Sequence, residues 1–320
     1  MKRFAAFLLT VTLTAFFTNS TGSSETGAAL RKGRPHILGV AHMALYVSDL
    51  KASRGFYKDF LGYAEPFALK REDGSDRIAF IKINDDQYIE LFAESPRQEG
   101  HLNHIAFFTD SAEVMRDYLA ATGIKVPDKV TKGRIGNSNF NILDPDGHTV
   151  EIVEYQPDSW TRRAKGKFMP DTRISTRIAH LGVLVAAVDP ALKFYRDVLG
   201  FKEFWRGSAT GKVLSWINMR VPDGNDYLEF MLYASPQDAA QMGVKNHICL
   251  VVPDVKQAVS RLESRPARKN YSRPIEIKIG INGKRQANLF DPDGTRIELM
   301  EPNTADGKPV PPSTAPPPTK

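Results

Sequence analysis

The stretch "NHICLVVPDV", residues 246–255, begins with an asparagine–histidine pair, continues with alternating apolar residues and ends in Pro-Asp. Three more stretches share this outline: "VAHMALYVSDL" (40–50), "NHIAFFTDSA" (103–112) and "IAHLGVLVAAVD" (178–189). Alternation of apolar residues is typical of a β-strand that buries one face. The sequence therefore predicts four strands that begin with histidine, at His42, His104, His180 and His247.

Each of these strands is followed by the same elements. Helical spacing of apolar residues predicts helices at 49–62, 110–123, 189–200 and 254–264. In the third helix we expect Asp189 as N-cap, Pro190 as the first helical residue and Gly200 as the stop. Short alternating strands follow, the last of them being "YIELFAE" (88–94), "TVEIVEY" (149–155), "YLEFMLY" (227–233) and "RIELMEP" (296–302). The repeated unit is β-α-β-β-β, four times over.

Polar residues recur at fixed places in these strands. The histidines face away from the apolar side of their strands, and two residues later that face carries a small residue: Ala44, Ala106, Gly182 or Cys249. In the last strands the outward face carries Glu90, Glu151, Glu229 and Glu298. A single such His or Glu is usually structural or solvated, but all four copies fill the positions, which favours metal binding. Two His and two Glu suit a divalent ion such as Zn, Ni, Co, Mn or Fe.

Length and composition set the wider frame. The 320 residues suggest two domains, and 42% hydrophobic with 25% charged residues is typical of a globular protein. The formal charge of +6 falls to +4 without Lys2 and Arg3, and no basic run is interleaved with aromatic residues. These features argue against a nucleic-acid partner.

The two ends of the chain differ from the repeats. "MKR", the apolar run that follows it and "TNSTGSS" predict a signal peptide at 1–24, hence export to the periplasm or beyond and no stable membrane span after processing. Residues 304–320 are expected to be a Pro-rich disordered tail. Between these ends we predict a first domain at 36–157, a linker at 158–173 and a second domain at 174–303.

The motifs "AHMALYVSDLKASRGFYKDFLGY", "DPDGHTVEIVE" and "DPDGTRIELME" resemble the vicinal oxygen chelate superfamily, which includes glyoxalase I, extradiol dioxygenases and bleomycin resistance proteins. The resemblance covers about Ile37 to Asn303. It implies an α+β fold in which four βαβββ modules pair into two curved mixed-sheet cups with helices outside. The first cup would hold His42, Glu90, His104 and Glu151, and the second His180, Glu229, His247 and Glu298.

The resemblance also implies an activity. The expected function is divalent-metal-dependent, glyoxalase-like lyase or isomerase chemistry on a small substrate with neighbouring oxygens, through a metal-stabilised enolate. Glu151 and Glu298 are the expected catalytic bases. An exported enzyme would rarely meet glutathione, which argues against the usual glyoxalase I substrate. The "DPDG" sequences themselves are typical of tight hairpin turns.

Two alternatives stay open. One is an extradiol-type ring-cleaving dioxygenase that uses the second domain, with His180, His247 and Glu298 as ligands. The other is a non-catalytic small-molecule-binding or resistance protein, although such proteins typically lack the metal ligands.

Further residues are candidates for substrate binding. Asn139 and Asn141 correspond to Gln286 and Asn288 when positions are counted back from each "DPDG", and these amides share one strand face. An exposed strand face explains them equally well. Tyr46 lies on the face of His42 and is expected to line the first cup.

Overall fold

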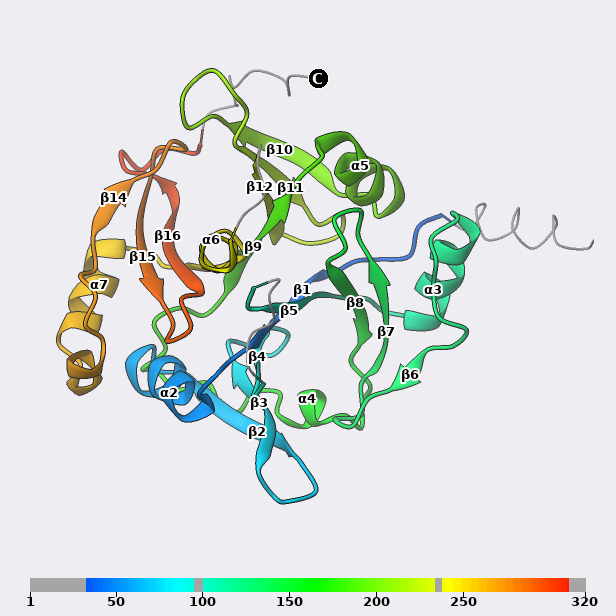
Figure 1. The fold of residues 1–320 in the computed structure, drawn as a ribbon, viewed down its shortest axis with the longest axis horizontal. Coiled ribbons are helices and arrows are strands. Elements are labelled where there is room, and N and C mark those ends of the chain that lie inside the picture. Colours follow the sequence, from blue (N-terminus) through cyan, green and yellow to red (C-terminus); the bar gives the residue numbers. More distant parts are fainter. Residues whose placement is uncertain (1–32, 95–99, 234–237, 311–320) are drawn as a thin grey trace, which may run out of the picture.

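Two eight-stranded sheets lie side by side in the computed structural model, which describes residues 33–94, 100–233 and 238–310 (Figure 1). The first sheet contains β1 Gly39–Tyr46, β2 Ala64–Lys70, β3 Asp76–Lys82, β4 Tyr88–Phe92, β5 Leu102–Phe108, β6 Thr131–Lys132, β7 Ser138–Leu143 and β8 Thr149–Glu154. The second contains β9 Ile178–Val185, β10 Lys202–Gly207, β11 Trp216–Arg220, β12 Tyr227–Leu232, β13 His247–Val251, β14 Ile277–Ile279, β15 Lys284–Phe290 and β16 Arg296–Thr304.

The order of the strands places the predicted ligands at the centre of each sheet. The first sheet runs β2-β3-β4-β1-β5-β8-β7-β6, and the second runs β10-β11-β12-β9-β13-β16-β15-β14. The first and last strands of a module pair in parallel, as β1 does with β4 and β5 with β8, while β1 and β5 pair antiparallel. The predicted α+β class with paired βαβββ modules and curled mixed sheets is confirmed.

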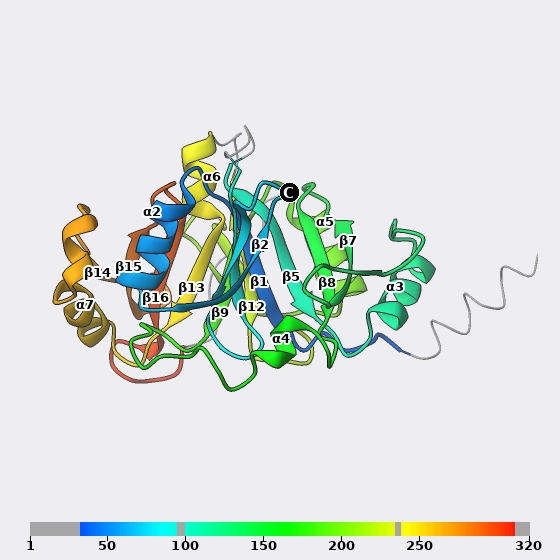
Figure 2. The ribbon, with the colours of Figure 1, turned by 90° about the horizontal axis from the view of Figure 1, so that it is seen from below.

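Helices cover the apolar faces of the sheets (Figure 2). Residues such as Met43, Leu181 and Ile248 point into this core and are fully buried. Burial of one such side chain stabilises the fold by roughly 1.5–3 kcal/mol. The helical segments are α2 Leu50–Arg54, η1 Gly55–Phe60, α3 Ala112–Ala121, α4 Trp160–Arg163, α5 Val188–Leu192, η2 Lys193–Val198, α6 Ala239–Lys245, α7 Val255–Glu263 and η3 Pro266–Asn270.

One helix begins earlier than the sequence indicated. The N-cap of α5 is Ala187, so the prediction of Asp189 as N-cap and Pro190 as first residue is wrong. Asp189 lies in the first turn instead, where its charge is favourable beside the free N–H groups. Pro190 is tolerated there because N–H groups of the first turn have no intrahelical partner. Gly200 ends the helical segment with a φ of 79°, which a glycine adopts without strain.

The two halves are interlocked through their hairpin turns. The Tyr57 hydroxyl in η1 donates to Asp291 at 3.0 Å, and the Tyr195 hydroxyl in η2 donates to Asp144 at 2.9 Å. Asp144 and Asp291 begin the two "DPDG" turns, which close with a Gly147 N–H to Asp144 carbonyl bond and its counterpart at Gly294. Each turn is therefore a docking point for a helix of the other half.

A second contact joins the starts of the central strands. Gln87 donates from Nε2 to Asp226 at 3.1 Å and accepts the backbone N–H of Ile178 at 2.8 Å. Asp226 in turn accepts the backbone N–H of Val40 at 3.1 Å. Because β1 and β9 begin at these bonds, the two sheets are held at their ligand-bearing strands.

The predicted linker, tail and signal peptide can be compared with the residues that the structure describes. The expected linker 158–173 contains α4, and β16 extends to Thr304, where the tail was expected to begin. The predicted signal peptide and residues 311–320 of the tail lie outside the described residues. No helix in the described part of the chain is long and apolar enough to span a bilayer.

Asp226 generates a prediction about pH. Burial raises the pKa of Asp226 to about 6. A carboxyl group with a raised pKa binds its proton more tightly in the folded state, so its contribution to stability is fully present below pH ~4 and is lost as the pH rises toward ~6. We expect Asp226→Asn to gain up to about 3 kcal/mol in stability relative to the wild type between pH 4 and 7. Urea unfolding across this range measures the difference, and a difference that does not change with pH contradicts the prediction.

Candidate metal centres

The second cup brings all four of its predicted ligands together. His180, Glu229, His247 and Glu298 each offer a donor atom, and these atoms lie within 4.8 Å of one another. The two Nε2 atoms are 3.1 Å apart, and each is 3.5 Å from Oε2 of Glu298. Glu229 Oε2 is 3.8 Å from His180 and 3.5 Å from His247.

The first cup forms a tighter group of three. His42, His104 and Glu151 lie within the same limit of 4.8 Å, and Glu151 Oε2 is 3.2 Å from His42 and 2.9 Å from His104. Glu90 contacts His42 at 3.6 Å but lies outside this compact group. All four side chains are buried.

Small residues make the room for these ligands. In the second sheet Gly182 pairs with both Glu229 and His247, and Cys249 pairs with both His180 and Glu298. Ala44 and Ala106 occupy the same places in the first sheet. A Cβ added at Gly182 would lie 1.9 Å from the His247 ring, so any larger residue would displace the ring from its present position.

Hydrogen bonds from the outer ring nitrogens orient two of the histidines. Nδ1 of His247 lies 2.6 Å from the carbonyl of Lys245, and Nδ1 of His104 lies 2.7 Å from Oδ1 of Asn103. Since these oxygens only accept, Nδ1 carries the proton and Nε2 keeps its lone pair for the centre of the cup. Nδ1 of His180 is buried without a partner among the described residues.

The two carboxyl groups of each cup differ in pKa. Burial raises the pKa of Glu90 and of Glu229. Burial also acts on Glu151 and Glu298, but hydrogen bonds from the two histidines of each cup hold the pKa of both carboxyl groups well below the usual range. Each cup therefore pairs one carboxyl group that releases its proton more readily with one that holds its proton more tightly.

These donors fit a divalent ion. Imidazole and carboxylate ligands suit borderline metals, and ligands that lie about 2.0–2.2 Å from one ion are themselves separated by about 3 Å or more. The donor separations of 2.9–3.8 Å agree with this requirement. Two carboxyl groups buried together also need a compensating charge, which an ion supplies.

The predicted substrate-binding amides are distributed unevenly. Gln286 is buried near the second centre, and Asn288 pairs directly with Glu298. Asn141 pairs with Glu151 in the same way but is exposed. Asn139 accepts a hydrogen bond from Thr131 at 3.2 Å within its own hairpin.

Tyr46 borders a different space. It lines a cavity of about 520 Å³ between the halves, together with Asn103 and Thr149 of the first half and Tyr233 and Asn246 of the second. Its ring lies 6.3 Å from that of Phe92.

A smaller cavity of about 250 Å³ opens onto the second centre. Glu229, Glu298 and Gln286 form part of its wall. The sequence interpretation missed its other walls, which are aromatic, apolar and cationic: Trp205, Trp216, Lys278, Ile279, Gly280, Ile281, Asn282, Arg296 and Met300. The sequence could have indicated Arg296 as part of the wall, because it lies two residues before Glu298 and so on the same strand face.

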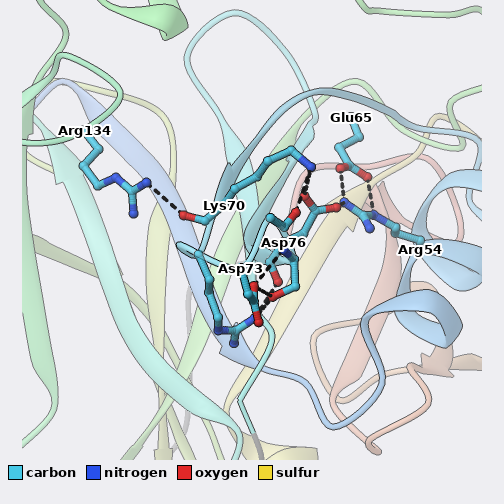
Figure 3. A network of polar contacts seen from close by, with 9 residues as sticks. Arg54, Glu65, Lys70, Asp73, Asp76 and Arg134 are labelled. Carbon is cyan, nitrogen blue, oxygen red and sulfur yellow. Dashed lines mark hydrogen bonds and ion pairs between the residues drawn. The ribbon is translucent and has the colours of Figure 1, made fainter.

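The corresponding side of the first cup is bridged by its own chain. The exposed Arg134 side chain donates to the carbonyl of Lys70 at 2.9 Å, which joins the β6–β7 connection to the edge strand β2 (Figure 3). The same edge is held by Arg54, which binds Glu65 at 2.8 Å and Asp76 at 2.7 Å (Figure 3).

Aromatic packing reinforces this bridge. The Trp160 ring of α4 packs edge-on against Phe67 at 5.5 Å, and Phe67 packs in turn on Phe80 and Tyr88. The first cup is therefore walled on this side by apolar side chains.

Both halves match the same family model. The model describes the Glyoxalase/Bleomycin resistance protein/Dioxygenase superfamily and matches residues 39–152 and 177–299. The uncharacterised protein YaeR of Escherichia coli is 31% identical over 126 residues, which are 36% of this chain and 95% of that protein. The uncharacterised protein YwbC of Bacillus subtilis is 26% identical over 123 residues, or 36% of this chain and 96% of that protein.

Solved structures share the arrangement of most of the chain. The Mn(II)-bound glyoxalase from Novosphingobium aromaticivorans has a TM-score of 0.60 and 19% identity, with 83% of each chain covered. The 2,3-dioxygenase LapB from Pseudomonas sp. KL28 has a TM-score of 0.62 and 16% identity, over 88% of this chain and 99% of that one. At these identities the likeness shows the fold.

The two centres generate a prediction about metal content. We expect two divalent ions per chain after reconstitution, because each cup gathers two imidazoles and at least one carboxylate. Elemental analysis should give one ion per chain for the double variant His180→Ala/His247→Ala and one for His42→Ala/His104→Ala. A ratio near one in the unchanged protein, lost only with the second-cup variant, would show that the first cup holds no ion.

Gly182 allows a sharper test of the second centre. In Gly182→Ala the new methyl group occupies the space of the His247 ring, so the ring must move and the metal content should fall from two to one. Gly55→Ala is the matched control, since nothing lies within 4 Å of a Cβ there. Two retained ions in Gly182→Ala would refute this role of the glycine.

Proposed function

Since the chain belongs to the Glyoxalase/Bleomycin resistance protein/Dioxygenase superfamily, we propose that it is a divalent-metal-dependent enzyme of the vicinal oxygen chelate type. The proposed reaction is glyoxalase-like lyase or isomerase chemistry on a small substrate with two neighbouring oxygens. The observation that carries it is the convergence of His180, Glu229, His247 and Glu298 on one buried point that a cavity reaches.

The histidines and the carboxylates of a cup have different roles in the proposed reaction. A bound ion supplies Lewis acidity that polarises a substrate carbonyl and stabilises negative charge on its oxygen. The carbonyl of Lys245 orients His247 in the second cup, and the side-chain amide of Asn103 orients His104 in the first cup. A carboxylate next to the substrate then removes the proton adjacent to the carbonyl and returns it to the neighbouring carbon.

Two pairs of carboxylates are candidates for the proton transfer. Glu151 and Glu298, the bases predicted from the sequence, are each bonded to both histidines of their cup and are thus held as ligands. Glu90 lies farther from His42 than Glu151 does, Glu229 lies farther from His180 than Glu298 does, and burial raises the pKa of both Glu90 and Glu229, so each binds a proton more readily. We propose Glu90 and Glu229 as a second pair to test beside the first.

An extradiol dioxygenase acting in the second cup is the other candidate, because the 250 Å³ cavity reaches Glu229 and Glu298. That chemistry also needs a residue that moves protons to the bound oxygen, usually a histidine. The second half contains no histidine besides His180 and His247, and the residue opposite Glu298 is Asn288.

Activity assays on the metal-reconstituted protein test the proposal. With adducts of α-oxoaldehydes and small thiols we expect conversion to the 2-hydroxy thioester, with deuterium incorporated next to the carbonyl in D₂O. Each of the four glutamates should be replaced by Gln in turn. The substitution that removes the base should lower the rate by about 10²–10⁴-fold while the metal is retained.

Two other outcomes would contradict it. Steady oxygen uptake with catechols by the iron-loaded protein, giving yellow products and lost in Glu298→Ala, would establish the dioxygenase. Retained metal without turnover of either substrate class would favour a binding protein.

A further inference from the structure

The walls of the two cups differ in charge, although their ligands are the same. Arg296 precedes Glu298 by two residues, and Thr149 is its counterpart before Glu151. Lys284 lies seven residues before its "DPDG" turn, where the first half has Asn137. The second cup therefore has two cations at positions where the first has neutral side chains.

Both cations lie beside the second centre. Arg296 Nη2 lies against the His247 ring, 2.7 Å from Nδ1 and 2.9 Å from Nε2. Lys284 is half-buried and lies in the chain between Asn282 and Gln286, which both line the cavity, and the charges of Glu229 and Glu298 act on its ammonium group. A divalent ion would neutralise the two carboxylates, so Arg296 and Lys284 would leave the occupied cup with an excess of positive charge.

The Arg296 side chain keeps donors for a ligand. An ion bound to Nε2 of His247 would use the lone pair of that nitrogen, so Arg296 could not donate to it. The guanidinium group has five N–H donors, and Nε of Arg296 is buried with no partner among the described residues. Arg296 also lines the cavity that leads to the centre.

The neutral wall of this cup has unused acceptors. Asn218 pairs with Glu229 across β11 and β12, is 4% exposed, and its Oδ1 has no partner in the described part of the chain. Oδ1 of Asn288, opposite Glu298, is also buried without a partner. Such atoms are costly to bury and favour a ligand with hydroxyl groups. In the first cup Phe80 stands opposite Glu90.

We propose that the second cup binds a small molecule that carries a carboxylate in addition to its two chelating oxygens, and that Arg296 and Lys284 bind this carboxylate. This inference rests on the proposed function and adds the carboxylate to its substrate class. Trp205 and Trp216 line the cavity and supply flat apolar walls for the rest of the molecule. The first cup, without the two cations, does not select for the carboxylate.

Calorimetric titration of the zinc-loaded full chain tests the proposal. The probes are 3,4-dihydroxybenzoate and 4-methylcatechol, which have the same chelating oxygens and differ in the carboxylate. We expect one site per chain that binds 3,4-dihydroxybenzoate at least about tenfold more tightly, as charged hydrogen bonds provide. Arg296→Gln and Lys284→Gln should each reduce this preference toward one with zinc content unchanged, whereas Thr149→Gln should keep it.

The outcomes separate the two proposals. Equal affinities with zinc in both cups, or a preference that survives Arg296→Gln and Lys284→Gln, would overturn the anion site and leave the proposed function standing. A chain that binds no zinc would overturn the proposed function, and the anion site with it. Should Arg296→Gln fail to fold, Lys284→Gln decides the same question.

Discussion

The close packing of an imidazole over a small residue on the neighbouring strand is the contact on which both centres depend. His247 lies where a side chain at Gly182 would have to be, and His104 lies opposite Ala44. In a sheet, a residue and its cross-strand neighbour on the same face compete for one volume. Four large ligands can therefore meet on adjacent strands only if the residues between them are small.

The interlocked halves keep this arrangement rigid. Asp226 and Gln87 fix the starts of β9 and β1, the strands that carry His180 and His42. The tyrosine contacts to Asp144 and Asp291 hold the turns from which β8 and β16 begin, and these strands carry Glu151 and Glu298. Ligands supported on strands that are themselves anchored at their ends keep a metal site within narrow limits.

The sequence predicted the modules and the ligands because both follow from local patterns. Alternation within a strand gives the face of His247 or Glu298 without knowledge of any other strand. The position of Asn218 beside Glu229 depends instead on the register of the β11–β12 hairpin, and the contact of Trp160 with Phe67 depends on the path of a segment without periodicity. Tyr46 was placed on the correct strand, but the space it borders is set by how the halves dock.

The two cups show which positions of a repeated module can change independently. A bound ion would fix the type and number of ligand atoms, which accounts for the recurrence of His and Glu in both halves. Arg296 and Thr149 lie on the same strand face as a ligand but contribute no ligand atom, so the charge there can change without loss of the ion. In the first cup Phe67, Phe80 and Trp160 form an apolar wall, whereas the cations Lys278 and Arg296 line a cavity in the second. Two centres with the same ligands thus present different electrostatic surroundings to whatever chelates the ion, and the difference in chemistry between them must come from the walls.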